Sequence, residues 1–285
     1  MGHFPNGEQS VTGTNPILLV GAQRSGTTAL GGAMSKAIAT LGGCFTINGK
    51  LPYLLRRWWT PEDRDAQHLR SDEVAHGLAR LLPQGEGADE WLKRTHEALQ
   101  ASARRASLTR VSIVNEVRRV CAEAYGLGPW GDKYNEYLLD LPWLSAMFPD
   151  ARWVCLTREP GEAVASMLAW RKDKPWNPSE AASAAKKWAY WTSCWLAFRD
   201  SVSPQQRIEI DYGALCEGRH ENLSEFVGVD MLPFLTNFRR ASQDRPLAPL
   251  NPDATQVRDT LIRLNILAKI QPESLSVSEP LSHKA

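Results

Sequence analysis

The sequence predicts an α/β fold in which a central, mostly parallel sheet is flanked by helices. Residues 16–20 and 151–157 are short, largely apolar runs typical of strands buried on both faces, and 207–210 is a third strand candidate. Segments with helical patterns separate these strands. Strands that alternate with helices are typical of parallel sheets joined by right-handed crossovers.

The segments between the first two strands carry helix signals of different strength. A turn rich in Gly and Thr at 21–28 precedes a helix of small residues at 29–39. The segment 44–59 has mixed signals, and we expect a loop with a short helix there. From 60 to 125 the pattern is largely helical and charged, with a break at 83–87.

Further helices are expected at 140–148, 162–170 and 223–229. The run NPSE, from Asn177 to Glu180, is typical of a helix start, because Asn can cap the helix, Pro suits the first position and Glu the third. The helix that follows carries an aromatic stripe that we expect in the core: Trp188, Trp191, Trp195 and Phe198.

Length and composition favour one folded domain. The chain has 285 residues, of which 43% are hydrophobic and 23% charged, and this suits a single large α/β domain over 1–285. Within it we expect a first phosphate-loop unit at 15–50, a helical insertion at 51–128 and a second binding part at 129–230. The Ser-rich tail at 273–285 is expected to be disordered.

Charge and cysteine content exclude several classes of function. A net charge of +1 gives no field that favours nucleic acid or an acidic membrane. No apolar run has the length of a membrane span and the start has no signal-peptide core, so we expect a soluble, cytoplasmic protein. Five scattered cysteines without a CxxC or Cys/His cluster indicate buried or free thiols and no metal site. No sequence feature specifies an oligomeric state.

The turn from Gly21 to Thr28 (GAQRSGTT) has the GxxxxG spacing of a phosphate-binding P-loop. Such a turn directs backbone N–H groups and a helix N-terminus at one phosphate. A nucleotide triphosphatase needs Lys after the second Gly, but here Thr27 takes that place and the cation is Arg24 inside the loop. The pattern favours a single 5′-phosphate that carries a transferable group. The alternative is a tight Gly turn with an incidental arginine.

A second basic site follows the second predicted strand. Arg158 stands at the carboxyl end of that strand, where open α/β sheets bind ligands, and Ser166 lies two turns along the next helix. Together they offer a cation and a hydroxyl to a second phosphate. The alternative is a surface arginine and an ordinary helix serine. Both sites together imply a ligand with two separate phosphate groups.

These segments resemble the family of sulfotransferases that depend on 3′-phosphoadenosine 5′-phosphosulfate (PAPS), in particular its bacterial and tyrosylprotein branches. GAQRSGTTAL resembles the 5′-phosphosulfate loop and WVCLTREPGEAVASM the 3′-phosphate motif. GDKYNEYLLDLPWLSAMFPDAR resembles a lysine-containing turn and the following helix, and RIEIDYGALCEGRHENLSEFVGVD the third strand, tyrosine turn and helix. The resemblance implies a P-loop-type sulfotransferase fold with the helical insertion as a lid. It also implies transfer of a sulfuryl group from PAPS to a hydroxyl of a small-molecule or glycan acceptor, without a metal.

The resemblance also assigns roles to individual residues. Arg158 and Ser166 would hold the 3′-phosphate, Tyr212 would help bind the nucleotide, and Lys133 would lie near the reacting sulfuryl group. A solvated lysine in a turn is the alternative for Lys133. The loop residues that would wrap the 5′-phosphosulfate are Arg24, Ser25, Gly26, Thr27 and Thr28.

The chain departs from the family pattern at three positions. Arg24 stands where the cytosolic enzymes have lysine, and Gly213 stands where glutamate usually follows the tyrosine. The tyrosylprotein branch has a carboxylate as its base, and this chain has Asn48-Gly49-Lys50 in that region. The identity of the base and protein tyrosine as the substrate are therefore open.

The candidates for the base come from the insertion. His68 is the first choice, because the pKa of a histidine suits proton transfer near neutral pH. A solvated helix face is the alternative for it and for the other candidates, and Glu116 is expected to be paired with neighbouring arginines. These other candidates are His76, Glu62, Asp63 and Glu116.

The acceptor site is expected under the insertion. Trp58 and Trp59 could stack on an acceptor or anchor the insertion, and anchoring is favoured. Trp176, from the loop after the second phosphate site, could contribute to the acceptor site. Two other functions remain open: a P-loop nucleotide kinase or NTPase, and a descendant of the family that binds nucleotide without catalysis.

Overall fold

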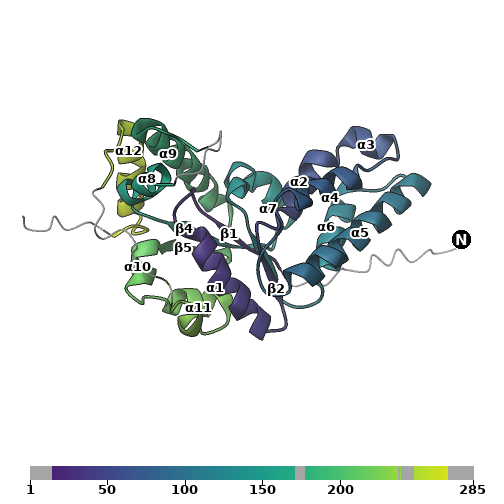
Figure 1. Cartoon of the computed structure of the whole chain (residues 1–285), viewed down its shortest axis with the longest axis horizontal. Helices are drawn as coiled ribbons and strands as arrows, with labels where there is room; N and C mark the ends of the chain where they lie inside the picture. The colour runs from purple at the N-terminus through teal and green to yellow at the C-terminus, as the bar shows by residue number, and fades with distance from the viewer. Residues whose placement is uncertain (1–14, 171–176, 237, 239–246, 269–285) are drawn as a thin grey trace, which may run out of the picture.

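Five parallel strands form one sheet in the order β2-β3-β1-β4-β5, and helices cover both of its faces (Figure 1). The computed structural model describes residues 15–170, 177–236, 238 and 247–268. Trp176 and the expected disordered tail lie outside these residues. The strands are β1 Ile17–Val20, β2 Cys44–Ile47, β3 Trp130–Lys133, β4 Arg152–Thr157 and β5 Arg207–Asp211. The predicted α/β class and all three predicted strands are confirmed.

The helices follow the chain in three groups. The first group, up to the third strand, is α1 Thr27–Thr40, α2 Leu51–Trp58, α3 Pro61–Asp65, α4 Ser71–Ala79, α5 Ala88–Leu108 and α6 Ile113–Tyr125. The second group is η1 Asn135–Leu139, α7 Leu141–Met147, α8 Pro160–Leu168, α9 Ala181–Phe198, η2 Arg199–Ser201 and η3 Pro204–Gln206. The third group is α10 Tyr212–Cys216, α11 Glu221–Val227, η4 Leu232–Phe234 and α12 Pro252–Arg263. None of the described helices is both long and apolar enough to cross a membrane.

Alternate residues of the first strand belong to two different hydrophobic cores. Leu18 and Val20 pack into the core that includes side chains from α5 to α9, whereas Ile17 and Leu19 pack into the core formed with α1, α10 and α11. All four side chains are almost fully buried. A strand that is covered on both faces needs apolar residues at every position, which explains the continuous apolar run in the sequence.

Two strands were not expected from the sequence. The segment 44–59, expected to be loop with a short helix, contains β2 before α2. β3 has the sequence Trp-Gly-Asp-Lys, which carries no strand signal by itself, but it lies between β2 and β1 in the sheet. Its burial is imposed by its neighbours, and both Asp132 and Lys133 are therefore buried at the carboxyl end of a central strand.

The insertion folds as a lobe of helices, α2 to α6, at the β2 end of the molecule (Figure 1). The predicted break at 83–87 is confirmed, and Gln84 there pairs with Ile47 in an isolated bridge. Trp59 is 2% exposed and belongs to the core, as the anchoring interpretation expects, while Trp58 is half-buried.

The aromatic stripe of α9 is buried in the core, as predicted. The predicted helix start is wrong by three residues, because the helix begins at Ala181 with Glu180 at its cap position. Asn177 instead donates from Nδ2 to the carbonyls of Met167 and Trp170, at the end of α8 (3.4 Å each). The asparagine therefore satisfies carbonyls at a helix C-terminus.

Candidate functional site

The predicted phosphate loop connects β1 to α1 at the carboxyl edge of the sheet. Arg24 and Gly26 both have positive φ (66° and 94°), so the loop turns sharply before the helix starts. A Cβ on Gly26 would lie 2.5 Å from ring carbons of Tyr212, which only glycine avoids. The hydroxyl of Ser25 is buried and has no hydrogen-bond partner among the described residues.

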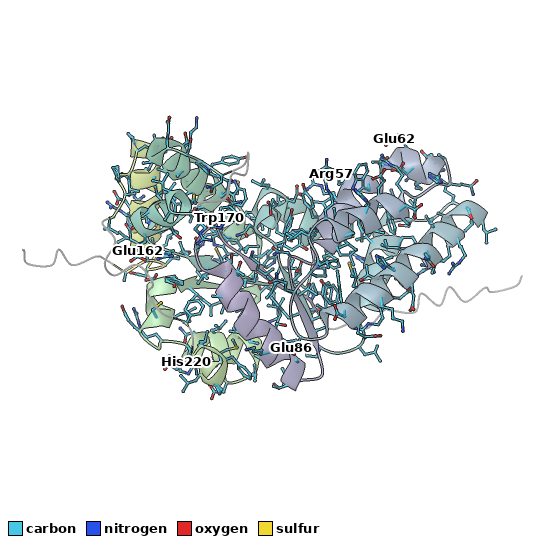
Figure 2. The ribbon with its side chains drawn as sticks, in the orientation of Figure 1. Arg57, Glu62, Glu86, Glu162, Trp170 and His220 are labelled. Atoms are coloured by element: carbon cyan, nitrogen blue, oxygen red, sulfur yellow. The ribbon has the colours of Figure 1, made fainter. Side chains whose placement is uncertain are left out.

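Both predicted basic sites meet at this loop. The Nε of Arg24 donates to Oγ of Ser166 (3.1 Å), and Nη1 of Arg158 donates to the backbone carbonyl of Arg24 (3.3 Å). Ser166 therefore contacts the loop arginine rather than Arg158, with which the sequence paired it. Arg158 forms a buried ion pair with Glu162 (2.9 Å). Figure 2 shows Glu162 and Trp170 on the α8 side of the loop, and the Trp170 ring lies 5.8 Å from the Arg24 guanidinium.

Tyr212 joins the loop to the second basic site. Its ring contacts Gly26 on the loop, and the guanidinium of Arg158 lies 4.5 Å from its centroid. Each of Tyr212 and Arg158 is 7% exposed. Burial raises the pKa of Tyr212 to about 12, so its phenol stays neutral. A cation stacked on a buried neutral ring is held in a fixed position.

Lys133 reaches the loop from the neighbouring strand. Its Nζ donates to Oγ1 of Thr28 (3.3 Å) and to Oδ1 of Asn48 (3.5 Å), and the residue is 3% exposed. Burial lowers the pKa of Lys133 to about 8, and the negative charges of Asp132 and Glu136 partly oppose that shift. The structure therefore does not support a solvated lysine at this position.

Asp132, beside this lysine, is a buried carboxylate that the sequence did not single out. It accepts hydrogen bonds from the backbone N–H groups of Gly49 (2.9 Å) and Lys50 (2.7 Å) and from two hydroxyls, of Thr46 (2.8 Å) and Tyr137 (2.7 Å). Burial raises the pKa of Asp132, while these four donors lower it. The carboxylate fixes the turn that follows β2, and its lone pairs are occupied by those donors.

Asn135 is a second residue that sequence reasoning missed. Its Nδ2 donates to the carbonyl of Gly21 (2.8 Å) and to Oγ1 of Thr27 (3.2 Å). It thus attaches η1 to both ends of the phosphate loop. A signal was available in the sequence, because Asn135 stands two residues after Lys133, the lysine that the sequence singled out.

The residues that meet at the phosphate loop form a group that we call the loop cluster: Arg24 to Thr28, Lys133, Asn135, Arg158, Ser166 and Tyr212. The first-choice base lies outside the loop cluster. His68 is exposed, and its backbone N–H donates to the carbonyl of Asp63 (2.9 Å) just after α3. Figure 1 shows α3 at the outer end of the helical lobe, and Figure 2 shows Glu62 there, far from Trp170. The insertion folds as a long lobe whose tip carries these residues. His76 is exposed on α4 of the same lobe.

The two remaining acids are engaged in structural contacts. Asp63 accepts from the backbone of Thr60 and from Arg70, as part of the cap of α3. Glu116 is 3% exposed and pairs with Arg105 (2.8 Å) and Arg119 (3.0 Å). The expectation that Glu116 is paired is confirmed.

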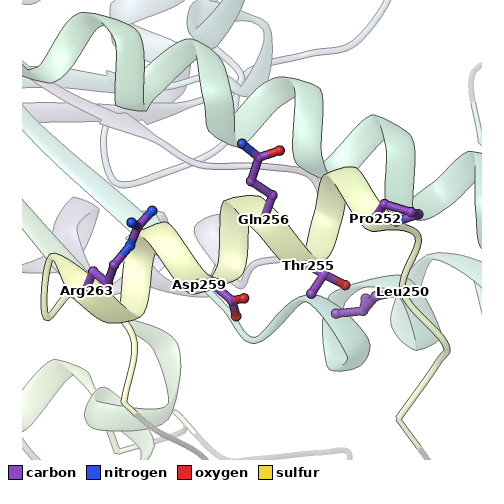
Figure 3. Close-up of a pocket in the computed structure, with 6 residues that line it drawn as sticks. All are labelled: Leu250, Pro252, Thr255, Gln256, Asp259 and Arg263. Carbon is purple, nitrogen blue, oxygen red and sulfur yellow. The ribbon is translucent and has the colours of Figure 1, made fainter.

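A separate hollow of about 710 Å³ runs along α12 and contains no residue of the loop cluster (Figure 3). Its lining is Leu250, Pro252, Thr255, Gln256, Asp259 and Arg263. Within the described residues, no three His, Cys, Asp or Glu side chains are grouped as a metal site requires, and the five cysteines form no disulfide.

Comparison with known proteins identifies the family. The sequence model of the Sulfotransferase family matches residues 16–231, which include every residue of the loop cluster, and the chain belongs to this family. Among solved structures, the sulfotransferase domain of the Synechococcus PCC 7002 olefin synthase is 20% identical with a TM-score of 0.56, covering 87% of this chain and 95% of that one. The sulfotransferase domain from the curacin biosynthetic pathway is 17% identical with a TM-score of 0.57, covering 87% and 97%. These likenesses show the fold. A search of curated protein sequences gave no match.

Proposed function

We propose that this sulfotransferase moves the sulfuryl group of PAPS to a hydroxyl of a small-molecule or glycan acceptor and releases 3′-phosphoadenosine 5′-phosphate (PAP). The observation that carries the proposal is the contact between the two basic sites. Arg24 and Arg158, predicted for two different phosphates, meet at one loop, and Lys133 reaches the same loop from the next strand.

The loop suits a single 5′-phosphate with a sulfuryl group attached. Backbone N–H groups at the start of α1 and the unpartnered hydroxyl of Ser25 can donate to it, and Arg24 adds a positive charge. Thr27 occupies the position at which a triphosphatase has lysine, and its Oγ1 accepts from Asn135. This engagement argues against a magnesium-triphosphate mode of binding.

The second site suits the 3′-phosphate. Arg158 is fixed by Glu162 and by the ring of Tyr212, and Ser166 lies beside the Arg24 side chain. A preorganised arginine loses little side-chain freedom when it binds a phosphate. The same tyrosine offers an aromatic ring to the nucleotide.

Charge develops on the leaving oxygen of the nucleotide as the sulfuryl group moves. Sulfuryl transfer resembles phosphoryl transfer in requiring in-line geometry and fixed positive groups on the leaving side. Lys133 and Arg24 supply two cations there, and Thr28 supplies a hydroxyl and an N–H group at the start of α1. No metal is part of this proposal.

We assign the acceptor site to the part of the helical insertion nearest the loop, with α2 as the lid over a soluble acceptor. A cytoplasmic location fits the five cysteines, which the structure leaves as free thiols.

Calorimetric titration with PAP, ADP and magnesium-ATP tests the donor site. We expect PAP to bind most tightly and Arg158→Ala to weaken PAP at least about tenfold while leaving ADP nearly unchanged. Because Arg158→Ala removes the ion pair with Glu162, the double variant with Glu162→Gln should show the same loss. Arg104→Ala, an exposed arginine on α5, is the matched control. Equal binding of PAP and ADP, or tight binding of magnesium-ATP, contradicts the proposal and favours a P-loop phosphotransferase.

Transfer is tested separately from binding. With ³⁵S-labelled PAPS, the wild-type protein should label at least one member of a panel of phenols, sugars and aliphatic alcohols. Tight PAP binding without transfer to any member, or to water, indicates a nucleotide-binding descendant without catalysis.

A further inference from the structure

We propose that Glu136 accepts the proton of the acceptor hydroxyl during transfer. The inference rests on the proposed function and names its missing base. It starts from the position of η1, which follows β3 directly and begins two residues after Lys133. Asn135 is bonded to the phosphate loop and Tyr137 to Asp132, so the residues on both sides of Glu136 are fixed.

Three lysines from three different elements lie within range of the negative charge of Glu136. Its negative charge acts on Lys50 before α2, on Lys133 at the end of β3 and on Lys187 of α9. Burial lowers the pKa of each of these lysines. Asp132 is the larger opposing charge for Lys50 and Lys133, with Glu136 second, and Glu136 alone opposes the shift of Lys187. Glu136 therefore lies in the same space as the lysine that reaches the loop.

Other acids near the site are already engaged. Asp132 accepts four hydrogen bonds, and Glu162 is paired with Arg158. Within the described part of the chain, no ion pair includes Glu136, which is half-buried. The Tyr134 phenol donates a hydrogen bond to Glu136, and a carboxylate that accepts one such bond keeps further lone pairs on which it can accept a proton.

Aromatic rings flank this carboxylate on the side of the insertion. Tyr134 lies 5.2 Å from Tyr53 of α2 and 5.5 Å from Tyr137, measured between ring centroids. Burial strongly raises the pKa of the Tyr134 phenol, and Glu136 raises it further, which places that phenol beside the carboxylate. The proposal places the acceptor between α2 and η1, with its hydroxyl between Glu136 and the loop.

The proposed step balances in bonds and protons. The acceptor oxygen forms a bond to sulfur as its proton passes to an oxygen of Glu136. The bond between sulfur and the bridging oxygen breaks, and its electron pair stays on the 5′-phosphate of PAP, beside Lys133. Protonated Glu136 then releases the proton to water.

The test uses the full chain, ³⁵S-labelled PAPS and the acceptor of the panel that the wild type uses best. Water counts as the last member of this panel. We expect Glu136→Gln to lower kcat by at least about 100-fold while the Kd of PAP changes by less than about threefold. Glu136→Asp should keep part of the activity, and added formate should restore activity to Glu136→Ala. Glu123→Gln, an exposed glutamate on α6, is the matched control.

The outcomes separate this inference from the proposed function. Wild-type kcat in Glu136→Gln overturns the inference and leaves the proposed function intact. The inference is also overturned if Glu136→Gln has lower PAP affinity, lower Tm and lower kcat together and formate does not restore the activity of Glu136→Ala. In that case Glu136 would only neutralise the lysines. A wild-type protein that binds PAP but transfers to no acceptor, water included, overturns both.

Discussion

The buried lysine at the loop predicts how nucleotide binding depends on pH. Burial lowers the pKa of Lys133 to about 8, whereas its ordinary value is 10.5. If the 5′-phosphate of PAP binds beside Thr28, as proposed, it favours the charged lysine, and binding above pH 8 then takes up a proton. The second pKa of a phosphate monoester is about 6, so the ligand itself changes little over this range.

The size of the effect follows from one titrating group. If binding requires the charged form, PAP affinity falls about tenfold between pH 7 and pH 9. Calorimetry at pH 8 in two buffers of different ionisation enthalpy should show uptake of about half a proton per nucleotide. In Lys133→Met the affinity should be lower at pH 7 and nearly flat with pH. A wild-type affinity that does not change between pH 7 and pH 9, or the same slope in Lys133→Met, would refute the reasoning.

The same lysine makes stability depend on pH in a defined direction. Its folded pKa lies below its unfolded pKa, so between pH 8 and 10.5 the unfolded chain holds more protons and the free energy of unfolding rises with pH. The full shift corresponds to about 3 kcal/mol. Lys133→Met should therefore be more stable than the wild type at pH 7, and the difference should shrink as the pH rises towards 10.5.

Four further predictions concern single positions. Gly26→Ala should lower the free energy of unfolding by about 1–3 kcal/mol in chemical denaturation, because the new Cβ meets the ring of Tyr212 at positive φ. Gly32→Ala in α1, where a Cβ meets nothing within 4 Å, should instead stabilise by up to about 1 kcal/mol. Arg24→Ala should weaken PAP by about 10- to 100-fold in calorimetry, and an unchanged Kd would remove Arg24 from the donor site. Glu116→Ala should cost about 2 kcal/mol of stability but leave PAP affinity intact, since its partners are structural.

The sequence predicted those parts of the fold whose local pattern matches their environment. β1 is apolar throughout and β4 is largely apolar because both faces of each strand are covered, and the glycines of the phosphate loop are required by its backbone. β3 could not be predicted in the same way. Its Gly131, Asp132 and Lys133 are buried only because β2 and β1 pair with it from both sides. Tertiary context overrode local propensity there.

The same distinction applies to the candidate site: residues in local motifs could be predicted, and residues placed by the tertiary fold could not. Arg24, Arg158 and Tyr212 stand in recognisable motifs, and the structure brings them together at one loop. His68 has the chemistry of a base, but its assignment depends on the whole insertion covering the site. The insertion instead extends sideways as a lobe, so the distance of a residue from the loop depends on its place along the lobe, which no local pattern encodes.

The position of the proposed base follows from the pairing of β2 with β3. Ile47 lies opposite Lys133 in the parallel register, and the N–H of Asn48 donates to the carbonyl of Lys133 (2.7 Å). The turns after the two strands therefore open at the same edge of the sheet, a few residues from each other. A carboxylate that is absent after β2, where Asn48 and Lys50 stand, can be supplied from the turn after β3 without moving the reaction. Glu136 occupies that turn, and its negative charge reaches Lys50, which stands after β2.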